Sequence, residues 1–273
     1  MAVTDTLPAS QKLLKSPERN RYFLGQMLAV RNFELETGYM NAKRHLLNRL
    51  VSGYGVLCGL DVRPGPDERH ILVTAGVALD KWGREIIVPE DTKPIEIPAH
   101  LLPRGGGYGK GGSEDAYKRD DYNKKNDEEE DEAVIRVMLC YHECEADPTP
   151  VLGGDCGTVS ECAASTIRER YRITFKEGAA PPRHMECRVP DLFRGDRIDY
   201  EALVRYVSEE CPQAPADPCI ALANLRLGSG GHACDPDRID IFIRPIVYTN
   251  DLLFEIILSL LAEGRDDYNR RSK

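Results

Sequence analysis

Apolar positions follow a helical period near the start of the chain and a strand period further on. Over Val30–Val51 they recur every three to four positions, so this stretch predicts one long helix. Gly53 and Gly55 follow and are typical of a helix end. Short runs of strand character come next. The run Gly76–Pro89 predicts a hairpin with Gly83 in its turn.

The second half of the chain continues this mixture of strands and helices. A short helix is predicted over 199–210, and an amphipathic helix should begin at Thr249 or Asn250 and end at Gly264. Strand patterns cover residues 133–144, 165–177, 218–228 and 238–246. The prediction is an α+β fold, with a strand-rich, β-sandwich-like core, one long N-terminal helix and a C-terminal amphipathic helix.

Composition divides the chain into segments. Residues 103–132 are Gly-rich and then charge-mixed, with no apolar period, so they predict a mobile insertion that cannot bury enough surface to order itself. The expected organisation is a flexible N-terminus over 1–17, a shoulder-like helix-plus-strand part over 18–102, the insertion over 103–132, a second strand-rich part with the C-terminal helix over 133–264, and a polar tail over 265–273. We expect the second strand-rich part to pack on the first.

Charge and hydropathy disfavour a nucleic-acid partner and a membrane-spanning segment. A net charge of −9 makes nucleic acid an unfavourable partner. The longest apolar run is far shorter than the roughly 20 residues of a membrane span, and the N-terminus lacks the apolar core of a signal peptide. We therefore expect a cytoplasmic protein without a transmembrane segment.

Cysteine and histidine provide the main candidate chemistry. In the strand pattern 133–144, Cys140, His142 and Cys144 share one face, and Cys156 and Cys162 follow in a Gly-rich stretch. Such a cluster predicts a structural zinc site. Two alternatives stay open: a disulfide, best placed between Cys211 and Cys219, and buried free thiols. No motif for a phosphate loop, a dinucleotide site or a catalytic nucleophile is present, and we predict no catalytic residue.

Three stretches carry a resemblance to a known family. They are Arg21-Tyr22-Phe23 with Gly25-Gln26, the segment Asn48–Val62, and the run G-x-A-x-D-x-x-G-R-E over Gly76–Glu85. They resemble a family of small baseplate-associated proteins encoded with phage-tail-like contractile injection systems. A weaker similarity extends to the shoulder domain of the type VI secretion baseplate adaptor and of phage receptor-binding proteins. The resemblance covers about residues 18–100.

The resemblance implies a non-enzymatic structural subunit. It would be a baseplate component or a fibre or spike adaptor, present in several copies and docked on other baseplate, spike or fibre proteins. Candidate interface residues are Arg21, Tyr22, Phe23, Phe33, Arg49 and Tyr54. Each aromatic ring has the alternative of an ordinary core position. Two other classes stay open: a surface-binding module for a glycan or a membrane, and a small zinc-dependent enzyme.

Overall fold

The computed structural model describes residues 16–67, 69–102, 133–151, 162–183, 189, 192–195, 197–227 and 236–271. At the C-terminal end the side chains are described as far as Leu261. The predicted insertion over 103–132 and nearly all of the predicted flexible N-terminus lie outside the described residues.

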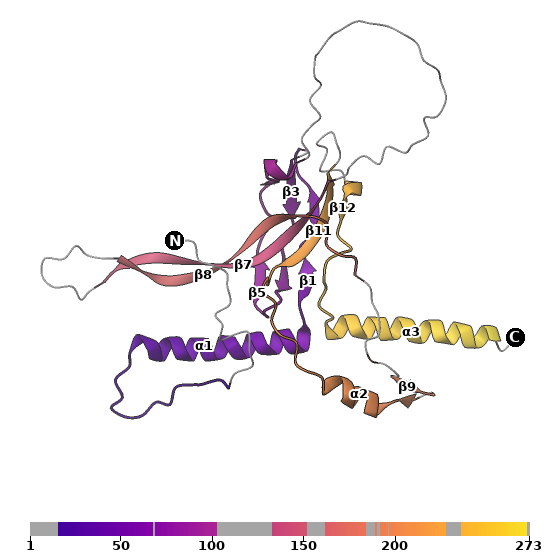
Figure 1. Ribbon diagram of the computed structural model, residues 1–273, viewed down its shortest axis with the longest axis horizontal. Coiled ribbons are helices and arrows are strands. Elements are labelled where there is room, and N and C mark those ends of the chain that lie inside the picture. The colour runs from indigo at the N-terminus through magenta and orange to yellow at the C-terminus, as the bar shows by residue number, and fades with distance from the viewer. Residues whose placement is uncertain are drawn as a thin grey trace, which may run out of the picture.

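The fold is α+β and strand-rich, with a long helix near the N-terminus and another at the C-terminus, as the sequence predicts (Figure 1). The principal elements are α1 (Val30–Leu47), the π-helical turn Asn48–Ser52, β1 (Gly55–Gly59), β2 (Val62–Pro64), β3 (His70–Val73), β4 (Gly76–Leu79), β5 (Glu85–Val88), β6 (Ile95–Glu96), β7 (Ala133–Pro150), β8 (Cys162–Glu177), β9 (Phe193–Arg194), β10 (Arg197–Ile198), α2 (Tyr200–Val207), β11 (Ile220–Leu227), β12 (Ile239–Asp240) and α3 (Asn250–Arg271). Short 3-10 turns lie at Ala99–Leu101 and Pro236–Arg238.

Three antiparallel sheets surround one hydrophobic core. Their strand orders are β1-β4-β5, β2-β3-β6 and β12-β11-β7-β8, and β9 and β10 form a separate small hairpin. Alternate residues of each strand point into the core, as the strand period requires. The core draws on both parts of the chain, and its fully buried members include Leu60, Ile71, Val73, Ile86, Val88, Ile135, Val137, Leu139, Ile220, Leu222 and Leu225.

Several elements extend away from this core. Figure 1 shows α1 and α3 running from one end of the strand-rich body in opposite directions. The strands β7 and β8 continue past the sheet as a long two-stranded arm. No residue of α1 is buried. These elements therefore offer their surfaces to something other than the chain's own core.

Helix and strand ends differ from the prediction in several places, and β7 in particular continues to Pro150, past the predicted end at 144. The C-terminal helix passes Gly264 and continues to Arg271, because an interior glycine costs only about 1 kcal/mol among good helix formers. The predicted end of the helix at Gly264 is therefore wrong. The predicted strand over 238–246 is present at Ile239–Asp240 and as an isolated bridge from Ile246 to Val56, because the chain turns between the two, where the Arg244 N–H donates to the Ile241 carbonyl at 3.2 Å.

The predicted hairpin around Gly83 is confirmed. β4 pairs with β5 in antiparallel register, with Leu79 opposite Glu85, and Gly83 turns the chain at φ +87°. Within the described part of the chain, no helix is long and apolar enough to cross a membrane.

Candidate docking surfaces

The C-terminal end of α1 is fastened to the tip of the β4–β5 hairpin. The Asn48 side chain donates hydrogen bonds to the Gly83 carbonyl at 2.9 Å and to Glu85 Oε1 at 2.8 Å. Arg44 Nε lies 3.2 Å from the same Glu85 oxygen. The last turn of the helix is therefore held by polar contacts to a rigid turn.

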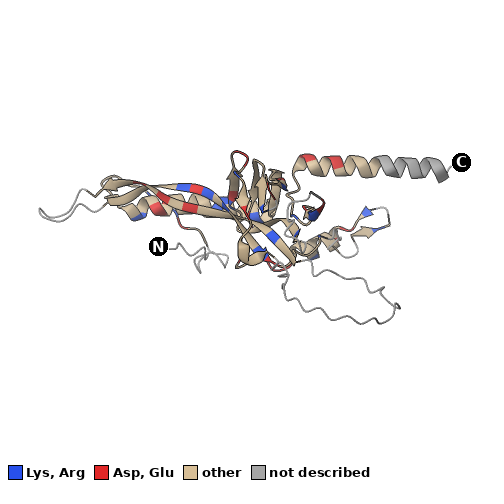
Figure 2. Ribbon diagram, turned by 90° about the horizontal axis from the view of Figure 1, so that it is seen from above, with Lys and Arg blue, Asp and Glu red and all other residues tan. Residues whose placement is uncertain are grey.

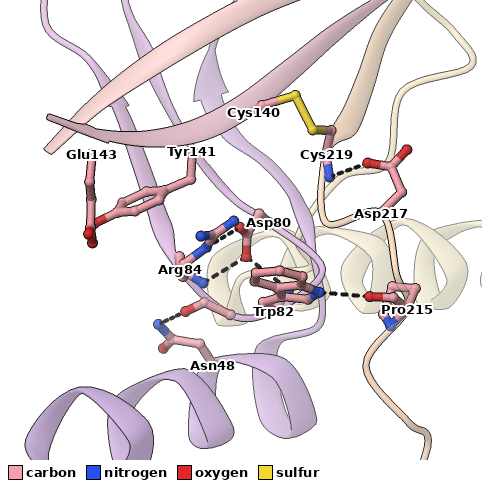
Figure 3. Close-up of polar contacts among 11 residues, drawn as sticks. Asn48, Asp80, Trp82, Arg84, Cys140, Tyr141, Glu143, Pro215, Asp217 and Cys219 are labelled. Carbon is pink, nitrogen blue, oxygen red and sulfur yellow. Dashed lines mark hydrogen bonds and ion pairs between the residues drawn. A yellow bond between two sulfur atoms is a disulfide. The ribbon is translucent and has the colours of Figure 1, made fainter. Parts of the chain in front are cut away.

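That turn is organised by one buried carboxylate (Figure 3). Asp80 is fully buried and accepts hydrogen bonds from the backbone N–H groups of Trp82 and Arg84 at 2.8 and 2.9 Å, and from Arg84 Nε at 2.7 Å. The Arg84 guanidinium lies 4.5 Å from the centre of the Trp82 ring and 4.4 Å from that of Tyr141. Trp82 Nε1 donates to the Pro215 carbonyl at 2.7 Å. Pairing of this kind compensates the cost of burying a charge.

Two glycines of the run Gly76–Glu85 lie where no larger residue fits. A Cβ on Gly83 would lie 2.1 Å from the His45 carbonyl oxygen, and one on Gly76 would lie 2.3 Å from the Cys58 carbonyl oxygen. Only glycine allows such close backbone approach. These contacts fix the helix on the body. The residues that make them are called the anchor below: Asn48, Asp80, Trp82, Gly83, Arg84 and Glu85.

Tyr141 closes one side of the anchor without offering chemistry. Its hydroxyl donates to Glu143 Oε1 at 2.8 Å. Burial, followed by the hydrogen bond and the charge of Glu143, raises the pKa of Tyr141 far above its ordinary value. The phenol therefore stays protonated and acts as a hydrogen-bond donor rather than as an acid–base group.

The rest of α1 presents apolar side chains to the surroundings. Phe33, Met40 and Leu47 are spaced by seven residues, so they lie along one side of the helix. Their exposed fractions are 56%, 63% and 59%. This set, the α1 stripe, is about 21 Å long, and an exposed apolar row of that kind marks an interaction surface.

The segment before α1 folds back along it and adds to the same surface. The Tyr22 hydroxyl donates to Glu36, and Asn20 donates to the Asn32 carbonyl. The hydrogen bond to Glu36 is the main reason why the pKa of Tyr22 is raised. Phe23 is exposed, as is Arg21. The exposed apolar side chains of this segment are Tyr22, Phe23, Leu24, Met27, Leu28 and Val30.

The last two predicted interface residues lie on the other side of the helix end. Tyr54 packs against the core, and its hydroxyl accepts a hydrogen bond from Arg183 at 3.4 Å. Arg49 is half-buried, and its NH1 atom has no hydrogen-bond partner among the described residues. Tyr54 therefore belongs to the body, whereas Tyr22, Phe23 and Phe33 are exposed, so the six candidates form no single patch.

Sequence reasoning missed a groove beside Tyr54. It has a volume of about 670 Å³ and is lined by Ser52, Gly53, Tyr54, Arg183, Ile241, Phe242, Arg244, Pro245, Ile246 and Tyr248. The segment that forms one wall is held on β1, because the Val56 N–H donates to the Pro245 carbonyl at 2.9 Å and the Val247 N–H donates to the Val56 carbonyl at 3.0 Å. Its Arg–Pro step inside an apolar run was the available signal against a strand.

The C-terminal helix offers a second apolar surface. Six apolar side chains of this helix are exposed at the spacing of one helical face: Leu253, Phe254, Ile257, Leu258, Leu260 and Leu261. This set is called the α3 face below. The amphipathic pattern that the sequence predicts for this helix is therefore present, but the apolar side is not covered by the chain's own body.

The cysteines are arranged differently from either specific prediction. Cys140 forms a disulfide with Cys219, which joins β7 to the start of β11, while Cys211 is free and exposed. The predicted Cys211–Cys219 pairing is wrong, because Cys219 lies directly beside Cys140 across the strand pair.

The disulfide also removes one predicted zinc ligand. A sulfur in a disulfide is not a thiolate, so Cys140 cannot bind zinc while this bond is formed. Cys144 and Cys162 are free thiols, His142 lies 3.1 Å from Arg172 NH2, and Cys156 lies outside the described residues. Among the described residues, no group of three His, Cys, Asp or Glu side chains is placed to hold a metal ion.

Comparisons with known proteins give little. No family model matches the chain, and no curated protein matches it. Among solved structures, a crystal structure of TssK is similar with a TM-score of 0.36 and 12% sequence identity, over 82% of this chain and 41% of that chain. The chain thus spans less than half the length of this structure, and a similarity of this size carries no argument about function.

Proposed function

We propose that this chain is a non-enzymatic structural subunit of a contractile injection system or phage-tail-like particle. It would serve as a baseplate component or as a fibre or spike adaptor, and it would act by docking on other subunits. The resemblance of Arg21–Val62 and Gly76–Glu85 to baseplate-associated proteins supplies the particle context. The α1 stripe supplies the physical argument for docking.

The exposed stripe on a fixed helix is the observation that carries the proposal. Exposing Phe33, Met40 and Leu47 brings no stabilisation in the isolated chain, whereas burial of each such side chain is worth about 1.5–3 kcal/mol. The anchor holds the helix in one position, so little conformational freedom is lost when a partner covers the stripe. The α3 face has the same character at the other side of the body.

The two alternative classes have less support. For a module that binds glycans, the single Trp of the chain offers no platform, because Trp82 is buried and its indole N–H is already bonded to Pro215. A zinc-dependent enzyme would need thiolate and imidazole ligands with an open coordination position. The disulfide at Cys140 takes one of those ligands away.

Deletion of the gene from its native host tests the proposal. Without this chain we expect particles that lack their distal proteins or that fail to assemble, as seen by electron microscopy of purified particles and by their protein content. Complementation with the wild-type gene should restore both. Particles that assemble and contract normally without this chain would contradict the proposal.

A further inference from the structure

The β7–β8 arm is a two-stranded ribbon that leaves the core. The core ends at Tyr141 on β7 and at Tyr171 on β8, which face each other in the ladder. Residues 142–150 and 162–170 continue beyond them, and strand geometry makes this extension about 30 Å long. It reaches well past the body in both views (Figures 1 and 2).

One face of the arm is basic. In an antiparallel ladder, residues directly opposite each other lie on the same face, and so do residues two positions along. The register pairs His142 with Arg170, Cys144 with Arg168, and Cys140 with Arg172. Three arginines therefore follow one another on β8 along a single face, Arg168 and Arg170 on the arm and Arg172 at its base, and all three are exposed.

The opposite face of the arm is acidic. The register places Glu143 directly opposite Glu169, and Glu145 opposite Ile167. The three carboxylates are exposed. They begin where Tyr141 leaves the core, and its hydroxyl already bonds to Glu143. The charged residues of both signs appear along the middle of the arm in Figure 2.

Both faces bring like charges together within the chain. Glu143 and Glu169 are direct cross-strand neighbours, an arrangement that destabilises a ladder. On the basic face Arg168 is paired with Asp147 at 2.7 Å, whereas Arg172 NH2 contacts the His142 ring at 3.1 Å instead of a carboxylate. Opposite charges brought to each face from outside would offset this repulsion.

We infer that the occupant of each face is the arm of a second copy of this chain. The basic face, with Arg170 and Arg172, lies on the acidic face of the neighbouring arm, with Glu145 and Glu169. The two faces are different surfaces, so the contact is heterologous and repeats from copy to copy into a ring or an open array. This contact uses neither the α1 stripe nor the α3 face, so it can be tested separately from the proposed docking.

Charge reversal with rescue tests this contact. Sedimentation velocity of the full chain at about 50 mM salt should show concentration-dependent self-association, which about 500 mM salt suppresses by screening. The double variant Arg170→Glu with Arg172→Glu has two acidic faces. The variant Glu145→Lys with Glu169→Lys has two basic faces, because Glu143 alone of the three carboxylates remains on the reversed face. Each alone should sediment as a monomer, and an equimolar mixture of the two should associate again.

The controls separate the contact from general effects of charge. Arg194→Glu with Arg197→Glu reverses two exposed arginines that face each other on the β9–β10 hairpin, and this variant should associate as the wild type does. Melting curves of all variants establish that they are folded. A wild-type chain that stays monomeric at low salt, folded arm variants that associate normally, or a mixture without rescue would each overturn the inference.

Discussion

The two ends of α1 contrast sharply in how they are held. At the C-terminal end, Asn48 and Arg44 bond to the β4–β5 hairpin, and the His45 carbonyl lies so close to Gly83 that no side chain fits between them. Along the rest of the helix no residue is buried, and the α1 stripe faces outward. One helix thus combines an end that is fixed to the body with a length that exposes apolar side chains.

The two parts of the helix place different requirements on the sequence. The anchor allows few substitutions, because its residues must pair a buried carboxylate with a guanidinium and also permit a close approach of two backbone segments. The α1 stripe requires only that apolar residues recur at helical spacing. Changes in the anchor should therefore act on stability, and changes in the stripe on association.

The largest expected effect comes from Gly83→Ala. Its Cβ would lie 2.1 Å from the His45 carbonyl oxygen at a backbone φ of +87°, so the helix end must move off the hairpin. We expect a loss of about 3 kcal/mol or more in the free energy of unfolding, measured by denaturant titration. Gly53→Ala is the matched control.

Gly53 shares the positive φ but not the close contact. Its φ is +77°, and nothing lies within 4 Å of the position of a Cβ. Gly53→Ala should therefore cost only the backbone strain, about 1–3 kcal/mol, and less than Gly83→Ala. Equal losses in the two variants would show that the contact between helix and hairpin is not what holds the helix.

Asp80→Ala should have an effect of similar size. It removes the acceptor of three hydrogen bonds and leaves the Arg84 guanidinium without its carboxylate between the Trp82 and Tyr141 rings. Breaking a buried pair by removing one partner costs about 3–5 kcal/mol. Double substitution with Arg84→Met should recover part of the loss. A denaturation midpoint equal to wild type would contradict the role of Asp80.

A smaller effect should appear as a pH dependence at the anchored end. Burial, and next the neighbouring Arg44, lower the pKa of His45 from its ordinary value near 6.5. Below pH 6.5 the unfolded chain then binds a proton that the folded chain does not, so stability is complete above that pH and falls on acidification. His45→Gln should make melting temperatures between pH 7 and about pH 5 less dependent on pH. An unchanged pH profile would show that the folded chain does not keep His45 neutral by burial.

How far the sequence predicts this molecule depends on the range of the interactions involved. The α1 helix, the Gly83 hairpin and the apolar face of α3 follow from local period and turn chemistry, and all three are present. The pairing of Cys140 with Cys219 depends on which strands become neighbours across 79 residues, which no local pattern encodes. A choice among nine cysteines was therefore open to error.

The candidate interface residues show the same limit. The sequence marks Phe33 and Tyr54 equally as aromatic positions in one specific segment, but the structure exposes the first and packs the second against the core. Exposure depends on the tertiary contacts of the whole segment. The sequence marked the run Gly76–Glu85 through its resemblance to a family. It did not predict that this run holds the end of α1, which depends on the tertiary contacts of Asn48 and His45.

Phe33→Ala gives the most direct test of docking through the α1 stripe. The variant and the wild type are compared as bait in pull-downs of the other particle proteins, alongside their melting curves. Phe193→Ala serves as the matched control, since this ring is 65% exposed on β9, away from α1, against 56% for Phe33. We predict that Phe33→Ala changes the free energy of unfolding by less than about 0.5 kcal/mol and abolishes co-purification, while Phe193→Ala changes neither. Normal co-purification of a folded Phe33→Ala variant would contradict the account.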